Sequence, residues 1–365
     1  MSIPPLVSVA MPVRNGERHL AEAVESILGQ SFRDFEFIIV DDASTDGTWG
    51  ILEKYAAADS RVRLLRHKAA NYLGAMNACC QAGRGRYIAR MDADDVSFPD
   101  RLERQVREME NRPEIAVLGG NAILIDDQGR HFGMMGSPTD NDRLQAKLLR
   151  CNCFVHPTTM VRREAMEAVG WFRPCFATSQ DYDLWLRISE RFQLAGLGQP
   201  VLYRRYHPTQ VGFTKMVTQV TCSLSARAAA RMRRDTGRDP LDGVGELTPQ
   251  ILLDLGIHPD QLNAAVVIRG LAMARHLIRA GYLDMALSAT KEAANRARTG
   301  EGRRHALAKA AKLRAIIRWR QRHPLKTLAA ALAAGGHYLL LAGQNLRLWT
   351  KPSVRTAASL DAPDL

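Results

Sequence analysis

In the first half of the chain, short runs of consecutive apolar residues alternate with segments whose apolar residues recur at the spacing of a helix. Four short runs rich in apolar residues predict buried strands, at Val7–Met11, Phe35–Val40, Val62–Leu65 and Arg86–Met91. Between them, helical spacing covers residues 17–30, 46–55, 73–81 and 99–111, with Asp46 as an N-cap and Pro99 at a first helical position. Strands and helices in this order predict a mostly parallel sheet with helices on both faces, which is an α/β fold.

Weaker signals continue to about residue 215. Strands are expected at Ile115–Gly119, Asn121–Ile125, Thr158–Val161 and Val201–Arg205, and helices at Asp140–Leu149 and Asp181–Arg191. Beyond residue 215 strand signals nearly vanish, and residues 216–235 and 259–349 are rich in Ala, Leu and Arg at helical spacing. We therefore expect a first domain over residues 1–215, an all-helical C-terminal region over 216–350 and a loose tail over 351–365.

Polar residues gather where three of these strands end. The first strand leads into Arg14-Asn15, the second into Asp41-Asp42, and the fourth into Asp92-Ala93-Asp94-Asp95. Open α/β sheets bind ligands in the crevice beyond the carboxyl ends of their strands. The three strand ends therefore predict one ligand site.

The Asp92–Asp95 cluster is the clearest chemical signal. Its three carboxylates lie within four residues and repel one another unless a cation lies among them. Hard oxygen ligands suit Mg²⁺ or Mn²⁺, which take their remaining ligands from phosphate and water. We expect a divalent metal, Mn²⁺ or Mg²⁺, held against a diphosphate, and the competing interpretation is a capping turn without a ligand.

Composition narrows the class of protein. The chain has 365 residues, of which 46% are hydrophobic and 24% charged, and this excludes disordered and collagen-like classes. Residues 263–326 hold 15 Lys/Arg and 3 Asp/Glu, an excess equal to the net charge of +12, so the basicity belongs to the C-terminal region. The six cysteines form no C-x-x-C pair, and the N-terminal sequence has no basic signal-peptide region. We expect reduced thiols and a cytoplasmic location.

The basic C-terminal region allows two interpretations. Leu307, Leu313 and Ile317 form part of an apolar stripe beside dense Arg and Lys, which is typical of a helix lying on an anionic membrane surface. The same pattern suits a helical bundle with solvated outer faces. Peripheral attachment to the inner face of the cell membrane is the first expectation and the bundle the alternative. No nucleic-acid partner is expected, because no series of aromatic residues interleaves the basic ones.

Four segments of the chain occur in an informative order. They are VSVAMPVRNGERHLAEAVESILGQSF, FEFIIVDDASTDGT, NYLGAMNACCQAGRGRYIARMDADD and SQDYDLWLRI. Together they resemble the inverting glycosyltransferases of family 2, over about residues 5–212. The resemblance implies the Rossmann-like GT-A fold and metal-dependent transfer from a nucleoside-diphosphate sugar to the hydroxyl of a sugar or lipid-linked sugar acceptor. It also implies a place in the synthesis of a surface polysaccharide or glycolipid.

The resemblance implies roles for individual residues. Asp181 matches the catalytic base, Asp94 the metal ligand of a D-x-D motif, and His207 a late histidine near the diphosphate, which we assign to the metal. The residues that match nucleotide-sugar contacts are Pro12, Arg14, Asn15, Asp42, Asn71, Asn77 and Asp92. Because Asp42 matches the aspartate that binds uracil or a related base, UDP or dTDP is the favoured donor nucleotide.

Some positions depart from the family's pattern or stay ambiguous. Arg14 stands where an aromatic residue is common, and Gln180 stands where glutamate is usual. Asp183 is the alternative base. His156, in a His-Pro-Thr sequence, is either part of the family's pattern or a buried structural histidine.

Two other classes of protein compete with a glycosyltransferase. A nucleotidyltransferase needs a Gly-rich, Lys-containing loop after the first strand, which residues 12–16 do not provide. A non-catalytic nucleotide-sugar-binding protein of the same fold has no need of Asp92, Asp94 and Asp181 together.

Overall fold

The computed structural model describes residues 3–207, 215–297 and 303–322. Backbone contacts divide the described residues into two units, residues 3–207 with 221–258 and residues 215–220 with 259–297 and 303–322. Each unit is described by itself. The domain boundary expected near residue 215 stays a prediction, and the tail over 351–365 lies outside the described residues.

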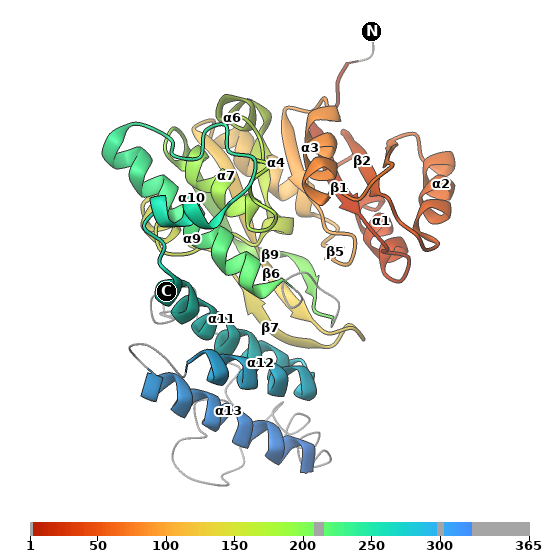
Figure 1. Ribbon diagram of the computed structural model, residues 1–365. Coiled ribbons are helices and arrows are strands. Elements are labelled where there is room, and N and C mark those ends of the chain that lie inside the picture. The colour runs from red at the N-terminus through yellow and green to blue at the C-terminus, as the bar shows by residue number, and fades with distance from the viewer. Residues whose placement is uncertain (1–2, 208–214, 298–302, 323–365) are drawn as a thin grey trace. The chain divides into compact units, whose positions relative to one another are not determined.

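The first unit is built on a nine-stranded sheet (Figure 1). Its strands are β1 Val7–Val13, β2 Phe35–Asp42, β3 Val62–His67, β4 Tyr87–Arg90, β5 Val96–Ser97, β6 Ile115–Ile125, β7 His131–Met135, β8 Met160–Arg162 and β9 Gln193–Arg205. They lie in the order β3-β2-β1-β4-β8-β6-β9-β5, with β7 paired to β6. The first four strands are parallel, as predicted, and so are β6 and β9. The pairs β4–β8, β6–β8, β6–β7 and β5–β9 are antiparallel.

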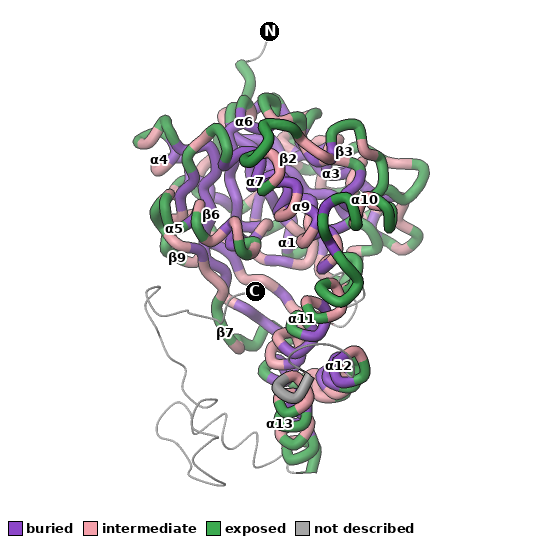
Figure 2. Tube along the Cα trace, turned by 60° about the vertical axis from the view of Figure 1, so that its left-hand side comes forward, coloured by how far each residue is buried: buried purple, intermediate pink, exposed green. Residues whose placement is uncertain are grey.

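Helices cover both faces of this sheet. They are α1 Leu20–Leu28, α2 Thr48–Ala58, α3 Tyr72–Ala82, α4 Arg101–Asn111, α5 Asn141–Leu148, α6 Arg163–Val169, α7 Gln180–Ser189, α9 Met216–Thr236 and α10 Pro249–Asp254, with a 3₁₀ turn at His156–Thr158. Alternate residues of β1 point to opposite faces, so that Val9 packs with α1 and α4 while Ala10 packs with α3 and α7. Figure 2 shows the buried strands enclosed between these helical layers.

The structure corrects the expectation of two strands around Gly119 and Gly120. β6 runs through both glycines as one strand. A Cβ on Gly119 would lie 2.3 Å from the Phe154 ring, and a Cβ on Gly120 would lie 2.3 Å from Val201. The glycines therefore allow large side chains to pack against the backbone of a continuous strand.

Several expected element boundaries are also wrong. The structure places the N-cap of α2 at Gly47 rather than at Asp46, but the Asp46 carboxylate still accepts the N–H of Thr48, the first residue of the helix, as well as that of Glu17. α4 begins at Arg101 rather than at Pro99. Thr158 lies in the 3₁₀ turn, so β8 starts only at Met160. The elements β5, β7, α6 and α10 were not predicted, because they are short and have weak periodicity.

The described part of the second unit consists of the start of α9 and the helices α11 Pro259–Arg279, α12 Leu283–Arg296 and α13 Arg303–Arg322. Leu313 and Ile317 of α13 are buried in a cluster with Leu271 and Leu277 of α11 and Ala293 of α12. Much of the apolar stripe expected to face a membrane thus packs inside a helical bundle. Among the described residues, no helix is both long and apolar enough to span a membrane.

Candidate active site

Two loops meet at the carboxyl edge of the parallel strands. β1 lies between β2 and β4, so the segments after these three strands share one edge of the sheet. The Asn15 N–H donates to Ser44 Oγ across 2.9 Å, and Asn15 Oδ1 accepts the N–H of Thr45 across 2.8 Å. Asn15 and Ala43 both have left-handed backbones, with φ of 51° and 55°. Such conformations cost free energy and persist where the surroundings fix them, as at ligand sites.

Three residues expected to contact the nucleotide sugar shape the rim of the crevice. Asp42 is 1% exposed and accepts the Asn71 N–H across 2.6 Å. The Asn71 side chain caps α3 through the N–H of Gly74. The Asn77 amide exchanges two hydrogen bonds, of 2.9 and 3.2 Å, with the backbone of Phe172. These contacts order the rim, while contact with a nucleotide stays a prediction.

The first loop contributes two further residues of the expected nucleotide site. Pro12 is buried within β1, next to Val40 of β2 in the register. Arg14 lies just past the end of β1 and is exposed to solvent. Its guanidinium is therefore open to a ligand in the crevice.

The acidic cluster follows β4 directly. Asp92, Asp94 and Asp95 each present a carboxylate oxygen, and these atoms lie within 4.8 Å of one another. The ring nitrogen Nε2 of His207 lies 2.8 Å from Asp94 Oδ2. The structure thus brings together two residues that are 113 positions apart and that the sequence assigned to one metal.

Arginines on β4 and β9 form an ion pair and hydrogen bonds with this cluster. Arg90 forms an ion pair with Asp92 and also donates to the hydroxyl of Tyr72. The Arg205 N–H donates to Asp95 Oδ1 across 2.8 Å, and Arg205 Nε donates to the carbonyl of Asp94. The other oxygen of Asp95, Oδ2, is buried and has no hydrogen-bond partner among the described residues.

The three carboxylates differ in their affinity for protons. Burial, followed by the charges of Asp94 and Asp92, raises the pKa of Asp95 well above its usual range. Burial and the charge of Asp94 also raise the pKa of Asp92, against the effect of Arg90. For Asp94, burial acts in the same direction, but the hydrogen bond and charge of His207 outweigh it and lower the pKa.

These features fit a divalent cation. Hard carboxylate oxygens that converge within a few ångströms form the donor set that Mg²⁺ and Mn²⁺ prefer. A cation there would also offset the repulsion that raises the pKa of Asp92 and Asp95, and it would give the orphaned Asp95 Oδ2 a partner.

Asp181 lies in the first turn of α7. Its Oδ2 accepts a hydrogen bond of 2.7 Å from the amide of Asn152. Burial raises the pKa of Asp181, and the Asn152 hydrogen bond partly opposes this rise. Ser179, just before α7, has a left-handed backbone with φ of 53°. Gln180, which replaces the glutamate usual in the family, is buried as the first residue of the helix.

One guanidinium connects the two acidic sites. The charge of Arg204, on β9, favours the ionised forms of Asp92, Asp94 and Asp95, and it does the same for Asp181. The acidic cluster and Asp181 are therefore both under the influence of one charge near the end of β9.

The alternative base and the ambiguous histidine are both packed into the fold. Asp183 is completely buried and forms ion pairs with Arg173 and Arg187, so it cannot reach an acceptor. The ring of His156 packs edge-on against Phe172 and Trp185. Burial, together with the charges of Arg90 and Arg204, lowers the pKa of His156 well below its usual range, which keeps the ring neutral.

Several residues of this site were not predicted from the sequence. Arg204 and Arg205 lie three and two residues before the predicted His207, but no spacing rule separates a cation at the site from one in solvent. Arg90 lies within an apolar strand, and Asn152 lies between two cysteines in a loop. Neither residue belongs to a recognisable pattern, so only the tertiary structure reveals them.

Known glycosyltransferase sequences resemble the first half of this chain. The family model for glycosyl transferase family 2 matches residues 8–170. EpsE of Bacillus subtilis (strain 168), which carries the name of a glycosyltransferase, is 40% identical over 194 residues, or 52% of this chain and 69% of EpsE. The O-antigen biosynthesis glycosyltransferase WbnJ of Escherichia coli is 33% identical over 186 residues, or 50% of this chain and 71% of WbnJ.

Solved structures share the fold. A crystal structure of S. aureus TarS 1–349 in complex with UDP-GlcNAc superposes with a TM-score of 0.51 at 17% identity, over 80% of this chain and 91% of TarS. The mannosyltransferase PcManGT from Pyrobaculum calidifontis, in complex with GDP-Man and Mn²⁺, gives a TM-score of 0.50 at 18% identity, over 91% of this chain and 87% of PcManGT. The fold and the family of the relatives define a glycosyltransferase with the GT-A fold, as the sequence predicted. The chain belongs to glycosyl transferase family 2.

The acidic cluster predicts a metal-dependent rise in thermal stability. Mn²⁺ in large excess should raise the Tm of the EDTA-treated protein by roughly 5 °C or more, because a ligand at 100 times its Kd stabilises the folded state by about 2.7 kcal/mol. Asp94→Asn should lose most of this shift, whereas Asp142→Asn, at an exposed position in the first turn of α5, should keep it. A full shift in Asp94→Asn, measured by differential scanning fluorimetry, would contradict the assignment.

Proposed function

We propose that this chain catalyses the metal-dependent, inverting transfer of a sugar from a nucleoside-diphosphate sugar to an acceptor hydroxyl. The observation that carries the proposal is the convergence of the Asp92, Asp94 and Asp95 carboxylates after β4, in a chain that also presents the carboxylate of Asp181 in the first turn of α7. Two related folds hold UDP-GlcNAc and GDP-Man, which supports a nucleotide-sugar donor.

The donor half of the site would be the acidic cluster. Asp94, with His207 against it, would be the main ligand of a divalent cation, and Asp92 and Asp95 would complete the anionic surface. Mn²⁺ is favoured because PcManGT binds it on a similar fold, with Mg²⁺ as the alternative. When bound, the cation would neutralise the charge that develops on the departing diphosphate.

The nucleotide would lie along the ends of β1 and β2. Pro12, Arg14, Asn15 and Asp42 line this edge, and the exposed guanidinium of Arg14 can stack on a base. One oxygen of Asp42 already holds Asn71, which leaves the other to accept an N–H from the base. This arrangement favours UDP or dTDP.

Asp181 would act on the acceptor. An acceptor hydroxyl has a pKa far above 7, so its oxygen attacks the anomeric carbon only as its proton is removed. The Asp181 carboxylate takes that proton while the bond between the sugar and the diphosphate breaks on the opposite face of the ring. Attack from the face opposite the leaving group inverts the anomeric configuration. The hydrogen bond from Asn152 leaves one carboxylate oxygen of Asp181 to receive the proton.

We place the reaction in the synthesis of a surface polysaccharide or glycolipid. WbnJ, which is similar to this chain, is named for O-antigen biosynthesis. The acceptor would be a sugar or a lipid-linked sugar. An acceptor of the second kind would lie at the cytoplasmic face of a membrane, so the enzyme would need to reach that surface.

The second unit offers a basic surface for that purpose. Lys312, Arg318 and Arg322 are exposed on α13, and the Trp319 side chain between them is 45% exposed. Leu313 and Ile317 of the same helix are buried in the bundle. The protein would therefore bind the membrane surface through charge, without inserting apolar side chains into the bilayer. Each Lys or Arg near an anionic surface contributes about 1 kcal/mol.

The proposed function predicts two separable losses of activity. A panel of UDP-, dTDP- and GDP-sugars, assayed for Mn²⁺-dependent release of nucleoside diphosphate, identifies the donor. Asp94→Asn should abolish both metal-dependent nucleotide binding and release. Asp181→Asn should keep the nucleotide Kd within about twofold and lower kcat by at least about 100-fold, because it removes only the base. A fully active Asp181→Asn protein would refute the base assignment.

The pH dependence provides a control on the same base. Asp181 works in its ionised form, so kcat/KM should fall as pH drops through a pKa above that of an ordinary aspartate. Asn152→Ala removes a hydrogen bond that favours the ionised form, so the acid limb should move to higher pH. If the acid limb of kcat/KM in Asn152→Ala lies at the same pH as in the wild type, the ionisation of Asp181 does not determine that limb.

The membrane proposal predicts binding that depends on charge. Wild-type protein should float with vesicles that contain phosphatidylserine and should be released by 0.5 M salt, roughly the range in which exposed charges are screened. The triple change Lys312→Glu, Arg318→Glu and Arg322→Glu should abolish flotation. The matched triple change Lys54→Glu, Arg107→Glu and Arg234→Glu alters exposed basic residues of the first unit and should have no effect. Equal flotation of both variants would refute the proposed surface.

A further inference from the structure

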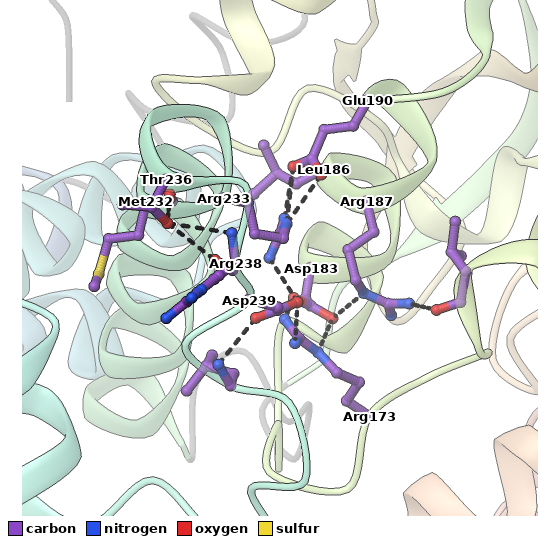
Figure 3. A network of polar contacts seen from close by, with 12 residues as sticks. Arg173, Asp183, Leu186, Arg187, Glu190, Met232, Arg233, Thr236, Arg238 and Asp239 are labelled. Atoms are coloured by element: carbon purple, nitrogen blue, oxygen red, sulfur yellow. Dashed lines mark hydrogen bonds and ion pairs between the residues drawn. The ribbon is translucent and has the colours of Figure 1, made fainter.

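A chain of alternating charges lies along one face of α7, the helix that carries Asp181 (Figure 3). Asp183, two residues after Asp181 on α7, accepts hydrogen bonds from Arg173 Nε across 3.0 Å and from Arg187 Nε across 2.9 Å. A second nitrogen of Arg173, Nη1, donates to Asp239 across 2.8 Å. Arg173 therefore lies between a carboxylate on α7 and a carboxylate that follows α9.

The same network reaches the other end of α7. Arg233, in the last turn of α9, donates to Asp239 across 3.2 Å. Arg233 also donates to Glu190, the C-cap of α7, across 2.8 Å. Both ends of α7 are thus tied to the pair formed by Arg233 and Asp239.

The network is balanced in charge and largely buried. It contains three guanidiniums, from Arg173, Arg187 and Arg233, and three carboxylates, from Asp183, Glu190 and Asp239. Their side chains are between 0% and 22% exposed. Loss of one partner leaves a poorly solvated, uncompensated charge, so each member constrains the position of the next.

The loop that leads into α7 is held under strain. Trp171 and Ser179 both have left-handed backbones, with φ of 61° and 53°. Arg187 donates to the carbonyl of Trp171 across 2.6 Å, and Arg173 extends from the middle of the same loop. Strained backbone of this kind persists only where several contacts determine it. The network supplies such contacts immediately before Asp181.

We propose that Asp239 is a positioning residue for the sugar-transfer reaction. By holding Arg173 against Asp183, it fixes the first turn of α7 and the direction of the Asp181 carboxylate. The inference rests on the proposed role of Asp181 as the base. It gives a part in the reaction to a residue that lies well beyond the segment 8–170 matched by the family model.

The variant Asp239→Asn tests this inference. It keeps an oxygen for the Leu241 N–H, which Asp239 Oδ1 now accepts, and removes the charge that holds Arg173. With the best donor sugar and Mn²⁺, kcat for release of nucleoside diphosphate should fall roughly tenfold or more, because a displaced base costs rate steeply. The Kd for the free nucleotide should stay within about twofold, and the acid limb of kcat should move to a different pH.

Controls separate positioning from general destabilisation. Glu292→Gln removes an exposed ion pair with Arg296 on α12 and should leave kcat unchanged. Arg233→Lys retains a cation beside Asp239 and Glu190, so its kcat should lie between those of the wild type and Asp239→Asn. All rates are measured at least 15 °C below the Tm of each variant. If Asp239→Asn fails to fold, Arg233→Lys carries the test.

The outcomes distinguish this inference from the proposed function. If Asp181→Asn is inactive but Asp239→Asn has wild-type kcat and an unchanged pH profile, the positioning role is overturned and the proposed base survives. If Asp181→Asn is active, both the base and the positioning role are overturned. If nucleotide affinity in Asp239→Asn falls as much as kcat, the network supports the fold in general and the inference is overturned.

Discussion

Repulsion among the carboxylates of Asp92, Asp94 and Asp95 is the constraint on which the rest of the site depends. Their oxygens share a space less than 5 Å across at the end of a buried strand, where separation in solvent cannot relieve the repulsion. The fold brings basic side chains and a histidine to them from distant parts of the chain, with Arg90 on β4 and Arg204, Arg205 and His207 at or just past the end of β9. Among the described residues Asp95 Oδ2 has no hydrogen-bond partner, which is the opening that a divalent cation would fill.

The topology of the sheet explains how these groups meet. Because β1 lies between β2 and β4, the loops after all three strands share one edge. β9 pairs in parallel with β6 and runs to Arg205, which delivers Arg204, Arg205 and His207 to the same region. α7, which carries Asp181, packs in the same buried cluster as α3 and α9. A cation held by Asp94 and a base at Asp181 would suit displacement at a carbon between them.

The sequence predicted the parts of this account that are local. Continuous apolar runs identified β1 to β4, and the polar residues after β1, β2 and β4 were placed at one edge of the sheet, because both signals lie within short windows. Continuity of β6 through Gly119 and Gly120 was not predictable, since it depends on Phe154 and Val201 packing against the bare backbone. The hydrogen bonds from Asn152 to Asp181 and from Arg173 to Asp239 were not predictable either, because they join residues 29 and 66 positions apart. Such contacts have no periodicity to detect.

The central claim is that a donor sugar is attacked from the Asp181 side while its diphosphate departs on the side of Asp94. The stereochemistry of the product tests this claim most directly. Proton NMR recorded during Mn²⁺-dependent turnover of an α-linked UDP-sugar resolves the anomer that forms first, before the free sugar mutarotates. The account predicts that the first product is the β-anomer, in the wild type and in Asn152→Ala alike. Initial release of the α-anomer would show retention, and it would contradict the assignment of Asp181 and Asp94 to opposite faces of the sugar.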